Sequence, residues 1–179
     1  MDDKRSRFEA LALPHLDAAY NLARWLGSSP ADADDIVQEA MLRAFRAFDS
    51  LRGSNVKPWL LAIVRNCFLN AKAASGRSGV PLPAEDETTI EDPLIGAAPD
   101  PESVAIDADH RQHLAALMAS LPREFREALL LREVEDLSYR EIATVTNTPI
   151  GTVMSRLARA RALLKERWLS EVEGAQHET

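Results

Sequence analysis

The stretch LSYREIATVTNTPIGTVMSRLARARALLKERW, residues 137–168, decides how this chain folds. Ser138, followed three positions later by Glu141, forms a capping box that predicts a short helix directly after the serine. Thr148 and Pro149 then supply the N-cap and first-turn chemistry that starts a second helix. Two helices joined by so short a break predict a helix-turn-helix motif.

The second predicted helix has one apolar face and one basic face. Its apolar residues recur at steps of four, three and four, at Val153, Leu157, Ala160 and Leu164. Its opposite side begins with small polar residues and continues with arginines, at Thr152, Ser155, Arg156 and Arg159. Residues 150–168 hold five basic residues and one acid. A helix that is buried on one side and basic on the other suits the major groove of DNA.

Composition limits the classes of protein to which the chain can belong. Its 179 residues, 46% of them hydrophobic and 6% aromatic, suit one ordinary domain or two small helical ones. Cys67 is the only cysteine, so no intramolecular disulfide can form, and no Cys/His cluster has metal-ligand spacing. No nucleophile–base set or phosphate-binding glycine loop is evident. We therefore expect neither an enzyme nor a bound cofactor or metal.

The ends and the apolar runs of the chain predict where it resides. No run of 18 apolar residues could form a membrane-spanning helix, which argues against membrane insertion. The first residues, MDDKRSRFEALAL, are too charged for a signal peptide, and the tail after Trp168 is short and polar. We expect a cytoplasmic protein.

The net charge of −7 is concentrated in one segment. Residues 1–75 hold 10 basic and 9 acidic side chains, and residues 111–179 hold 10 of each, whereas residues 76–110 hold 1 basic and 9 acidic. The flanking parts can therefore present basic faces despite the overall charge. Five prolines and a Ser/Gly-rich start mark residues 76–101 as a flexible acidic linker, which could reach about 90 Å when fully extended. A passive solvated spacer is the simpler interpretation of this segment.

The remaining sequence predicts an all-α fold with a small helical domain on each side of the linker. The first, residues 1–75, contains predicted helices at 5–26, 30–48 and 56–74, with Pro14 able to split the first. The second, residues 102–170, contains a helix from 102 to 119, a break at 121–122, a helix to 133 and the helix-turn-helix. Residues 171–179 form a polar tail.

Taken together, these blocks resemble the sigma-70 superfamily, most closely the extracytoplasmic-function (ECF) sigma factors. The resemblance rests on DADDIVQEAMLRAFRAF (32–48), KPWLLAIVRN (57–66) and LPREFREALLLREVEDLSYREIATVTNTPIGTVMSRLARAR (121–161). It implies that residues 1–75 are a three-helix-type sigma region 2 and that residues 102–170 are sigma region 4. It also implies that core RNA polymerase and promoter DNA are the partners.

The resemblance implies three sets of site residues. The set that contacts the β′ clamp helices of the polymerase would be Asp34, Asp35, Gln38, Glu39 and Arg43. The set that captures an unpaired base of the −10 element would be Arg52, Ser54, Asn55, Lys57, Arg65 and Asn66. The set that reads the −35 element would be Thr152, Ser155, Arg156, Arg159 and Arg161.

Several of these assignments have a simpler alternative. The aspartates near the start of the second helix also suit its N-cap and its dipole, and Asn55 also suits an ordinary turn. Trp59 fits a core position better than a role in strand melting. Arg161 fits a phosphate contact or a solvated face. Met154 lies where relatives often carry Lys or Arg, which weakens any prediction of the −35 sequence.

The resemblance further implies contacts of the second domain with the polymerase β-flap, and control by an anti-sigma factor in a stress or environmental response. Two other hypotheses stay open. One is an ordinary helix-turn-helix regulator whose first domain binds a ligand or dimerises. The other is a sigma-like decoy that binds an anti-sigma factor without reading DNA. The basic recognition helix argues against the decoy, and the polymerase-docking pattern argues against the regulator.

Overall fold

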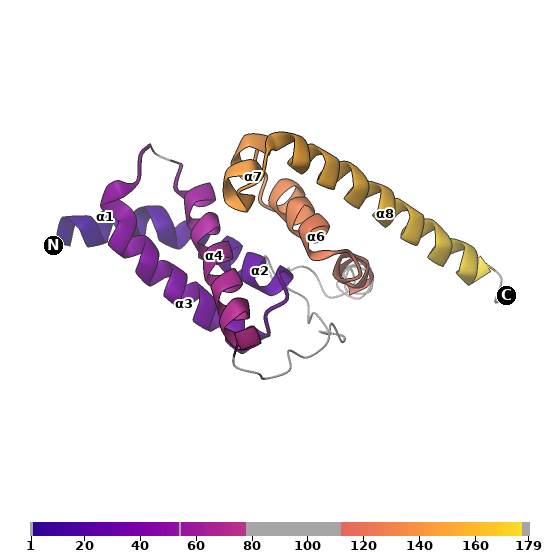
Figure 1. The fold of residues 1–179 in the computed structure, drawn as a ribbon, viewed down its shortest axis with the longest axis horizontal. Helices are drawn as coiled ribbons and strands as arrows, with labels where there is room; N and C mark the ends of the chain where they lie inside the picture. Colours follow the sequence, from indigo (N-terminus) through magenta and orange to yellow (C-terminus); the bar gives the residue numbers. More distant parts are fainter. Residues whose placement is uncertain (1, 54, 78–111, 177–179) are drawn as a thin grey trace, which may run out of the picture.

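Helices form two adjacent lobes in the computed structural model, which describes residues 2–53, 55–77 and 112–176 (Figure 1). The N-terminal lobe consists of α1 (Asp2–Ala12), the 3-10 turn η1 (Leu13–His15), α2 (Leu16–Trp25), α3 (Pro30–Ala47), the 3-10 turn η2 (Phe48–Ser50) and α4 (Val56–Arg77). The C-terminal lobe consists of a helix at 112–119, α6 (Arg123–Leu129), the π-helical turn η3 (Leu130–Val134), α7 (Tyr139–Thr146) and α8 (Ile150–Gln176). The described residues contain no strand, as the sequence predicted.

The N-terminal lobe follows its sequence signals closely. Pro14 splits the first predicted helix into α1 and α2 through η1, because a proline ring interrupts regular helical hydrogen bonding. Ser29 caps α3, where its hydroxyl accepts a 3.1 Å hydrogen bond from the backbone N–H of Asp32. α4 continues to Arg77, slightly into the segment predicted as linker. The rest of that linker, together with the predicted helical residues 102–111, lies outside the described residues.

The helix-turn-helix forms at α7 and α8 with one difference from the sequence prediction. The capping box is present in full: the Ser138 hydroxyl accepts from the backbone of Glu141, whose carboxylate accepts from the backbone of Ser138 at 2.7 Å. Asn147, in the left-handed conformation, ends α7. Pro149 was expected in the first turn, but α8 begins at the next residue, a one-residue shift at the end of a helix. Its last turns, up to Gln176, occupy part of the predicted polar tail.

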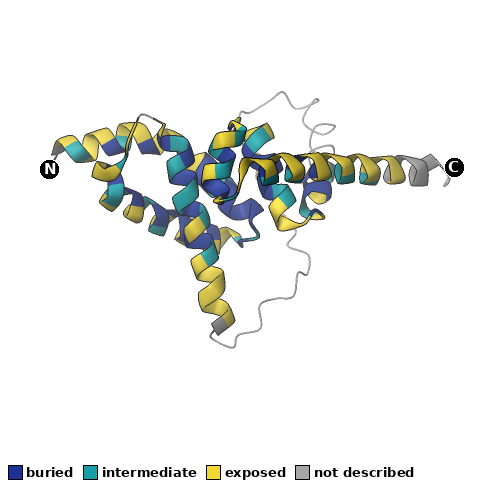
Figure 2. Ribbon diagram, turned by 45° about the horizontal axis from the view of Figure 1, so that its top comes forward, coloured by how far each residue is buried: buried dark blue, intermediate teal, exposed yellow. Residues whose placement is uncertain are grey.

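One hydrophobic core joins the two lobes. The larger cluster of buried residues includes Leu22, Val37 and Phe68 of the N-terminal lobe together with Ile142 and Leu157 of the C-terminal lobe. Figure 2 shows this burial concentrated where the lobes meet, whereas α8 is largely exposed from Lys165 to Ser170. A smaller cluster lies within the N-terminal lobe between α1, α3 and α4. The lobes are therefore not independent bodies joined only by a linker.

α4 contributes to both clusters. Leu60 packs in the smaller one beside Phe8 and Phe48, whereas its neighbour Leu61 packs in the larger one with residues of α7. Trp59 is partly buried against the smaller cluster, so its indole packs on the core as predicted, although its burial is incomplete.

Removing the cap of α7 should destabilise the folded protein. Ser138→Ala leaves the backbone N–H of Glu141 without its acceptor, which should lower the free energy of unfolding by about 1 kcal/mol. Urea unfolding followed by circular dichroism measures the change. Ser170→Ala, at an exposed position of α8, is the control and should change stability much less. Equal effects of the two substitutions would contradict the capping argument.

Candidate nucleic-acid interface

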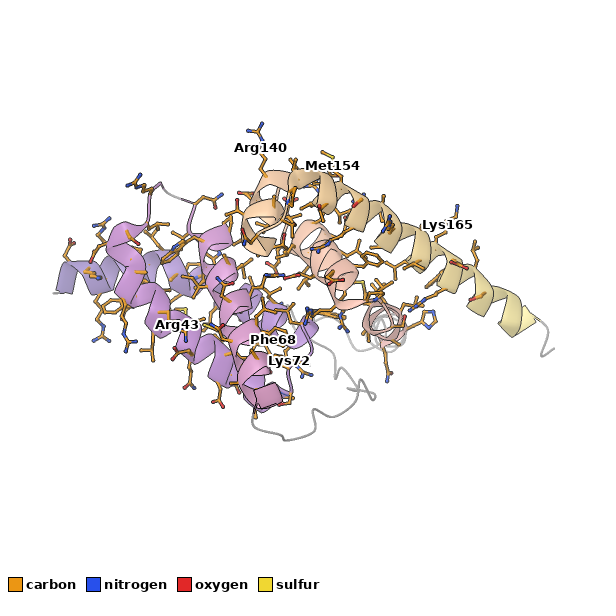
Figure 3. The ribbon with its side chains drawn as sticks, in the orientation of Figure 1. Arg43, Phe68, Lys72, Arg140, Met154 and Lys165 are labelled. Atoms are coloured by element: carbon orange, nitrogen blue, oxygen red, sulfur yellow. The ribbon has the colours of Figure 1, made fainter. Side chains whose placement is uncertain are left out.

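An exposed polar surface lies along α3. Asp34, Asp35 and Gln38 are solvent-exposed, and Arg43 donates from Nε to Glu39 at 2.5 Å one turn apart. Figure 3 shows the Arg43 side chain on this helix. The capping alternative applies to Asp32, whose carboxylate accepts from the Ser29 hydroxyl at 2.7 Å. The other two aspartates therefore remain available to a partner.

The loop before α4 and the start of that helix face the C-terminal lobe. The side-chain amide of Asn55 donates to Oε1 of Glu141 at the start of α7. Lys57 Nζ lies 2.8 Å from Oε2 of Glu135 and also donates to the backbone carbonyl of Glu135 at 2.8 Å. Arg52 is exposed. Ser54, also predicted to contact the −10 strand, lies outside the described residues.

About two turns further along α4, Arg65 makes a largely buried ion pair between the lobes. Its Nε lies 2.6 Å from Oε1 of Glu127 on α6, and the Glu127 side chain is only 1% exposed. This burial raises the pKa of the Glu127 carboxyl, while the charges of Arg65, Arg123 and Arg156 act in the opposite direction. Asn66, the next residue of α4, is exposed and takes no part in this contact.

Glu127, Glu135 and Glu141 are not among the site residues that the sequence predicted. Glu127 lies four residues before the buried Leu131, so it occupies the apolar side of its helix. An acid at such a position signals a buried partner. That signal could have identified Glu127, but not the lobe that supplies the partner.

The outer side of α8 remains open to solvent. Ser155 and Arg159 are exposed and Thr152 is partly exposed, as a surface that reads DNA requires. Met154 is 48% exposed, and Figure 3 shows it pointing into solvent with Arg140 of α7 and Lys165. Arg140 is not among the site residues that the sequence predicted.

Two of the predicted −35 arginines face the protein in part. The Nη1 atom of Arg156 is buried without a hydrogen-bond partner, and the charge of Arg156 acts on Glu127. Arg161 donates from Nη2 to Glu133 at 2.6 Å in an exposed pair. Both arginines therefore keep part of the side chain toward the protein, whereas Arg159 is exposed.

An open cavity of about 360 Å³ lies between the N-terminal lobe and α7. Its walls include Arg52, Asn55 and Trp59 on one side, and Arg140 and Glu141 on the other. The cavity therefore brings the residues predicted for base capture against the first turn of the helix-turn-helix.

The described residues offer no metal site and no membrane span. No group of three or more His, Cys, Asp or Glu side chains in ranges 2–53, 55–77 and 112–176 could hold a metal ion. Within the same ranges, no helix has the length and apolar character needed to cross a bilayer.

Comparison with known proteins identifies the family. The model for Sigma-70 region 2 matches residues 11–78, and the model for Sigma-70, region 4 matches residues 111–164. The ECF RNA polymerase sigma-E factor of Escherichia coli (strain K12) is 38% identical over 137 residues, which cover 73% of this chain and 70% of that protein. The chain belongs to the ECF sigma-70 family.

Further relatives extend the similarity over both lobes. The ECF sigma factor SigE of Mycolicibacterium smegmatis is 34% identical over 159 residues, which cover 89% of this chain but only 60% of that longer protein. The sigma factor RpoE, solved in complex with the anti-sigma factor NepR from Bartonella quintana, aligns with a TM-score of 0.70 and 30% identity. This alignment covers 89% of this chain and 95% of RpoE.

A more distant structure shares the fold. CnrH, solved in complex with the cytosolic domain of CnrY, aligns with a TM-score of 0.63 and 22% identity. The alignment covers 93% of this chain and 90% of CnrH. In this sigma-70 protein the α3 surface and the α4 residues belong to region 2, and the predicted −35 residues belong to region 4.

Glu141 should make stability depend on pH in the acidic range. The backbone N–H of Ser138 is the main cause that lowers the pKa of Glu141, and the Ser138 hydroxyl and Asn55 amide lower it further. Because the folded pKa lies below the unfolded value of about 4.3, the ionised carboxylate stabilises the fold above that value. This contribution is lost as the pH falls through the folded pKa.

Glu141→Gln tests this dependence because glutamine keeps the capping geometry without the charge. The variant should be less stable by about 0.3–1 kcal/mol at neutral pH, the usual value of an acid at a helix N-terminus. The difference should vanish toward pH 3 in a series of urea unfolding curves. A difference that does not change with pH would contradict the prediction.

Proposed function

We propose that this protein is an ECF-type sigma factor that binds core RNA polymerase and directs it to specific promoters. The observation that carries the proposal is the presence, in one chain, of matches to sigma regions 2 and 4 with an exposed recognition helix in the second. The protein would have no catalytic activity of its own and would provide promoter recognition to the polymerase. It would work in the cytoplasm, where polymerase and promoter are found.

Region 2 would provide the attachment to the polymerase. The exposed carboxylates and amide of Asp34, Asp35 and Gln38, with the Glu39–Arg43 pair beside them, would contact the β′ clamp helices. These side chains lie on α3, and the Glu39–Arg43 pair forms within that helix. Region 4 would contact the β-flap through the surroundings of α6.

The two lobes would read two promoter elements. In region 4, Thr152, Ser155 and Arg159 would contact the −35 element, and Arg156 and Arg161 would join them through the exposed parts of their side chains. In region 2, Asn55 would contact an unpaired −10 base, because an amide both donates and accepts hydrogen bonds. Arg52, Ser54, Lys57, Arg65 and Asn66 would support the same strand through polar and phosphate contacts.

We further propose that an anti-sigma factor controls the protein in a stress or environmental response. The support is that the RpoE structure, at 30% identity and over nearly the whole chain, was solved with the anti-sigma factor NepR. The acidic segment between the lobes would lie toward the RNA exit channel, where negative charge can occupy a basic path made for nucleic acid.

In-vitro transcription tests the proposed function directly. Purified protein is mixed with core RNA polymerase and fragments of genomic DNA, and the RNA products are sequenced. We expect specific run-off transcripts that depend on this protein. Binding to core polymerase without any specific transcript would favour the decoy hypothesis, and binding to DNA without core polymerase would favour an ordinary regulator.

Arg159→Ala should change which −35 sequences are used. If its guanidinium contacts a base edge, the substitution should cost about 1–3 kcal/mol of promoter binding and relax selectivity at one −35 position. Transcription from a library of −35 variants measures both effects. Lys165→Ala is the matched control, since this exposed cation lies further along α8 and should weaken all sequences equally. Uniform weakening by Arg159→Ala would instead assign Arg159 to a phosphate.

A further inference from the structure

Three residues predicted to contact the −10 strand are paired with carboxylates of the other lobe. Asn55 donates to Glu141, Lys57 pairs with Glu135 at 2.8 Å, and Arg65 pairs with Glu127 at 2.6 Å. The partners come from three different elements of the C-terminal lobe: α6, the residue that follows η3, and α7. None of the three sets of site residues implied by the resemblance to sigma factors includes Glu127, Glu135 or Glu141.

These carboxylates resemble the groups that DNA would present. A carboxylate and a phosphate are both anionic oxygen acceptors, and lysine and arginine form charge-assisted hydrogen bonds with either. Lys57 has two acceptors here, the Glu135 carboxylate and the Glu135 backbone carbonyl. The Lys57 and Arg65 side chains are 24% and 14% exposed, and their partners Glu135 and Glu127 only 6% and 1%, so most of each cation is covered while the lobes are in contact.

We propose that Glu127, Glu135 and Glu141 form an internal acidic ligand that occupies the −10 surface of region 2 and keeps the free protein closed. This inference rests on the proposed function, because it assigns a regulator to the same −10 surface. In the closed state region 4 substitutes for the promoter strand. Promoter opening then requires the lobes to part, so that the strand replaces the glutamates.

The other two predicted surfaces stay accessible in the closed state. Asp34, Asp35 and Gln38 are exposed on α3, and Ser155 and Arg159 are exposed on α8. Core polymerase can therefore approach the closed protein, whereas a −10 strand would meet Lys57 and Arg65 already paired with glutamates. The closed state blocks the strand-capturing step and leaves docking possible.

Apolar packing and ion pairs contribute differently to closure. Leu61 of α4 shares one buried cluster with Ile142 and Val145 of α7, and this burial supplies a non-directional attraction between the lobes. Buried ion pairs add little net stability because both charges lose water, but a buried charge left without its partner is strongly unfavourable. The glutamates therefore make closure depend on matching charges, and a wrong charge at one of them should open the lobes.

The Lys57–Glu135 pair allows a test by charge exchange. Glu135→Lys places a second cation against Lys57, whereas Lys57→Glu combined with Glu135→Lys restores an opposite pair. Glu133→Lys is the matched control, because it makes the same charge change two residues away. Glu133 is 54% exposed and pairs with Arg161 inside its own lobe. Glu135→Gln provides a milder variant in case Glu135→Lys does not fold.

The distance between the lobes is measured in the free, full-length protein by pulsed electron spin resonance. Spin labels are attached at Leu42→Cys on α3 and Glu166→Cys on α8, both exposed positions, in a Cys67→Ala background. We expect a single short distance in the parent and in Glu133→Lys, and a longer, broader distribution in Glu135→Lys and, to a smaller extent, in Glu135→Gln. The exchanged pair should return to the short distance.

Access to DNA is measured with a fluorescent 20-nucleotide oligothymidylate, which probes the strand-binding cations without a known promoter. Glu135→Lys should bind it at least fivefold more tightly than Glu133→Lys, which carries the same net charge. The proposal of an internal ligand is wrong if the distance between the lobes is unchanged in Glu135→Lys and Glu135→Gln. It is also wrong if Glu133→Lys separates the lobes as much as Glu135→Lys does. If the lobes of Glu135→Lys separate but the variant binds the oligothymidylate no more tightly than Glu133→Lys does, the proposal that the glutamates cover the strand-binding surface is wrong.

The test of the internal ligand can fail or succeed independently of the test of the proposed sigma function. Neither the distance nor the oligothymidylate measurement uses RNA polymerase or transcription. Charge-dependent closure together with no transcript from core polymerase would reject the sigma function and keep the internal ligand. Specific transcripts, together with a distance between the lobes that does not change in the charge variants, would keep the sigma function and reject the internal ligand.

Discussion

The packing of α4 on both of its sides is the constraint on which the structure depends. Leu60 lies in the core of the N-terminal lobe, while Leu61, next in sequence, lies in the core that the two lobes share. From Val56 to Phe68 this helix is buried on two sides, which leaves a narrow polar stripe on which Lys57 and Arg65 lie. The residues proposed to meet DNA are therefore placed at the edge of the contact between the lobes.

This placement explains how a region 4 lobe without net charge can have two opposite electrostatic faces. Its residues 111–179 hold 10 basic and 10 acidic side chains. Glu127, Glu135 and Glu141 face α4, whereas Arg140 and Arg159 face solvent on α7 and α8. The lobe can thus bind cations of region 2 on one side while it offers cations to DNA on the other. Net charge alone would show neither face.

Local signals accounted for most of the helices and for part of the site. The capping box at Ser138 and the proline at position 14 act within one or two turns, so their effects can be read from neighbouring residues. The exposed positions of Ser155 and Arg159 follow from the helical repeat of Val153 and its apolar partners. The partly buried Arg156 departs from this pattern, because its environment includes Glu127 from another helix.

The sequence by itself determined the family, the all-α architecture and the residue types that could meet polymerase and DNA, because these depend on local periodicity and on motifs. Only the tertiary structure decided that the lobes share a core and that Asn55, Lys57 and Arg65 are paired with glutamates far away in the chain. No helical period or linker composition specifies which surfaces meet. That choice depends on the combined fit of apolar faces and charges from both lobes.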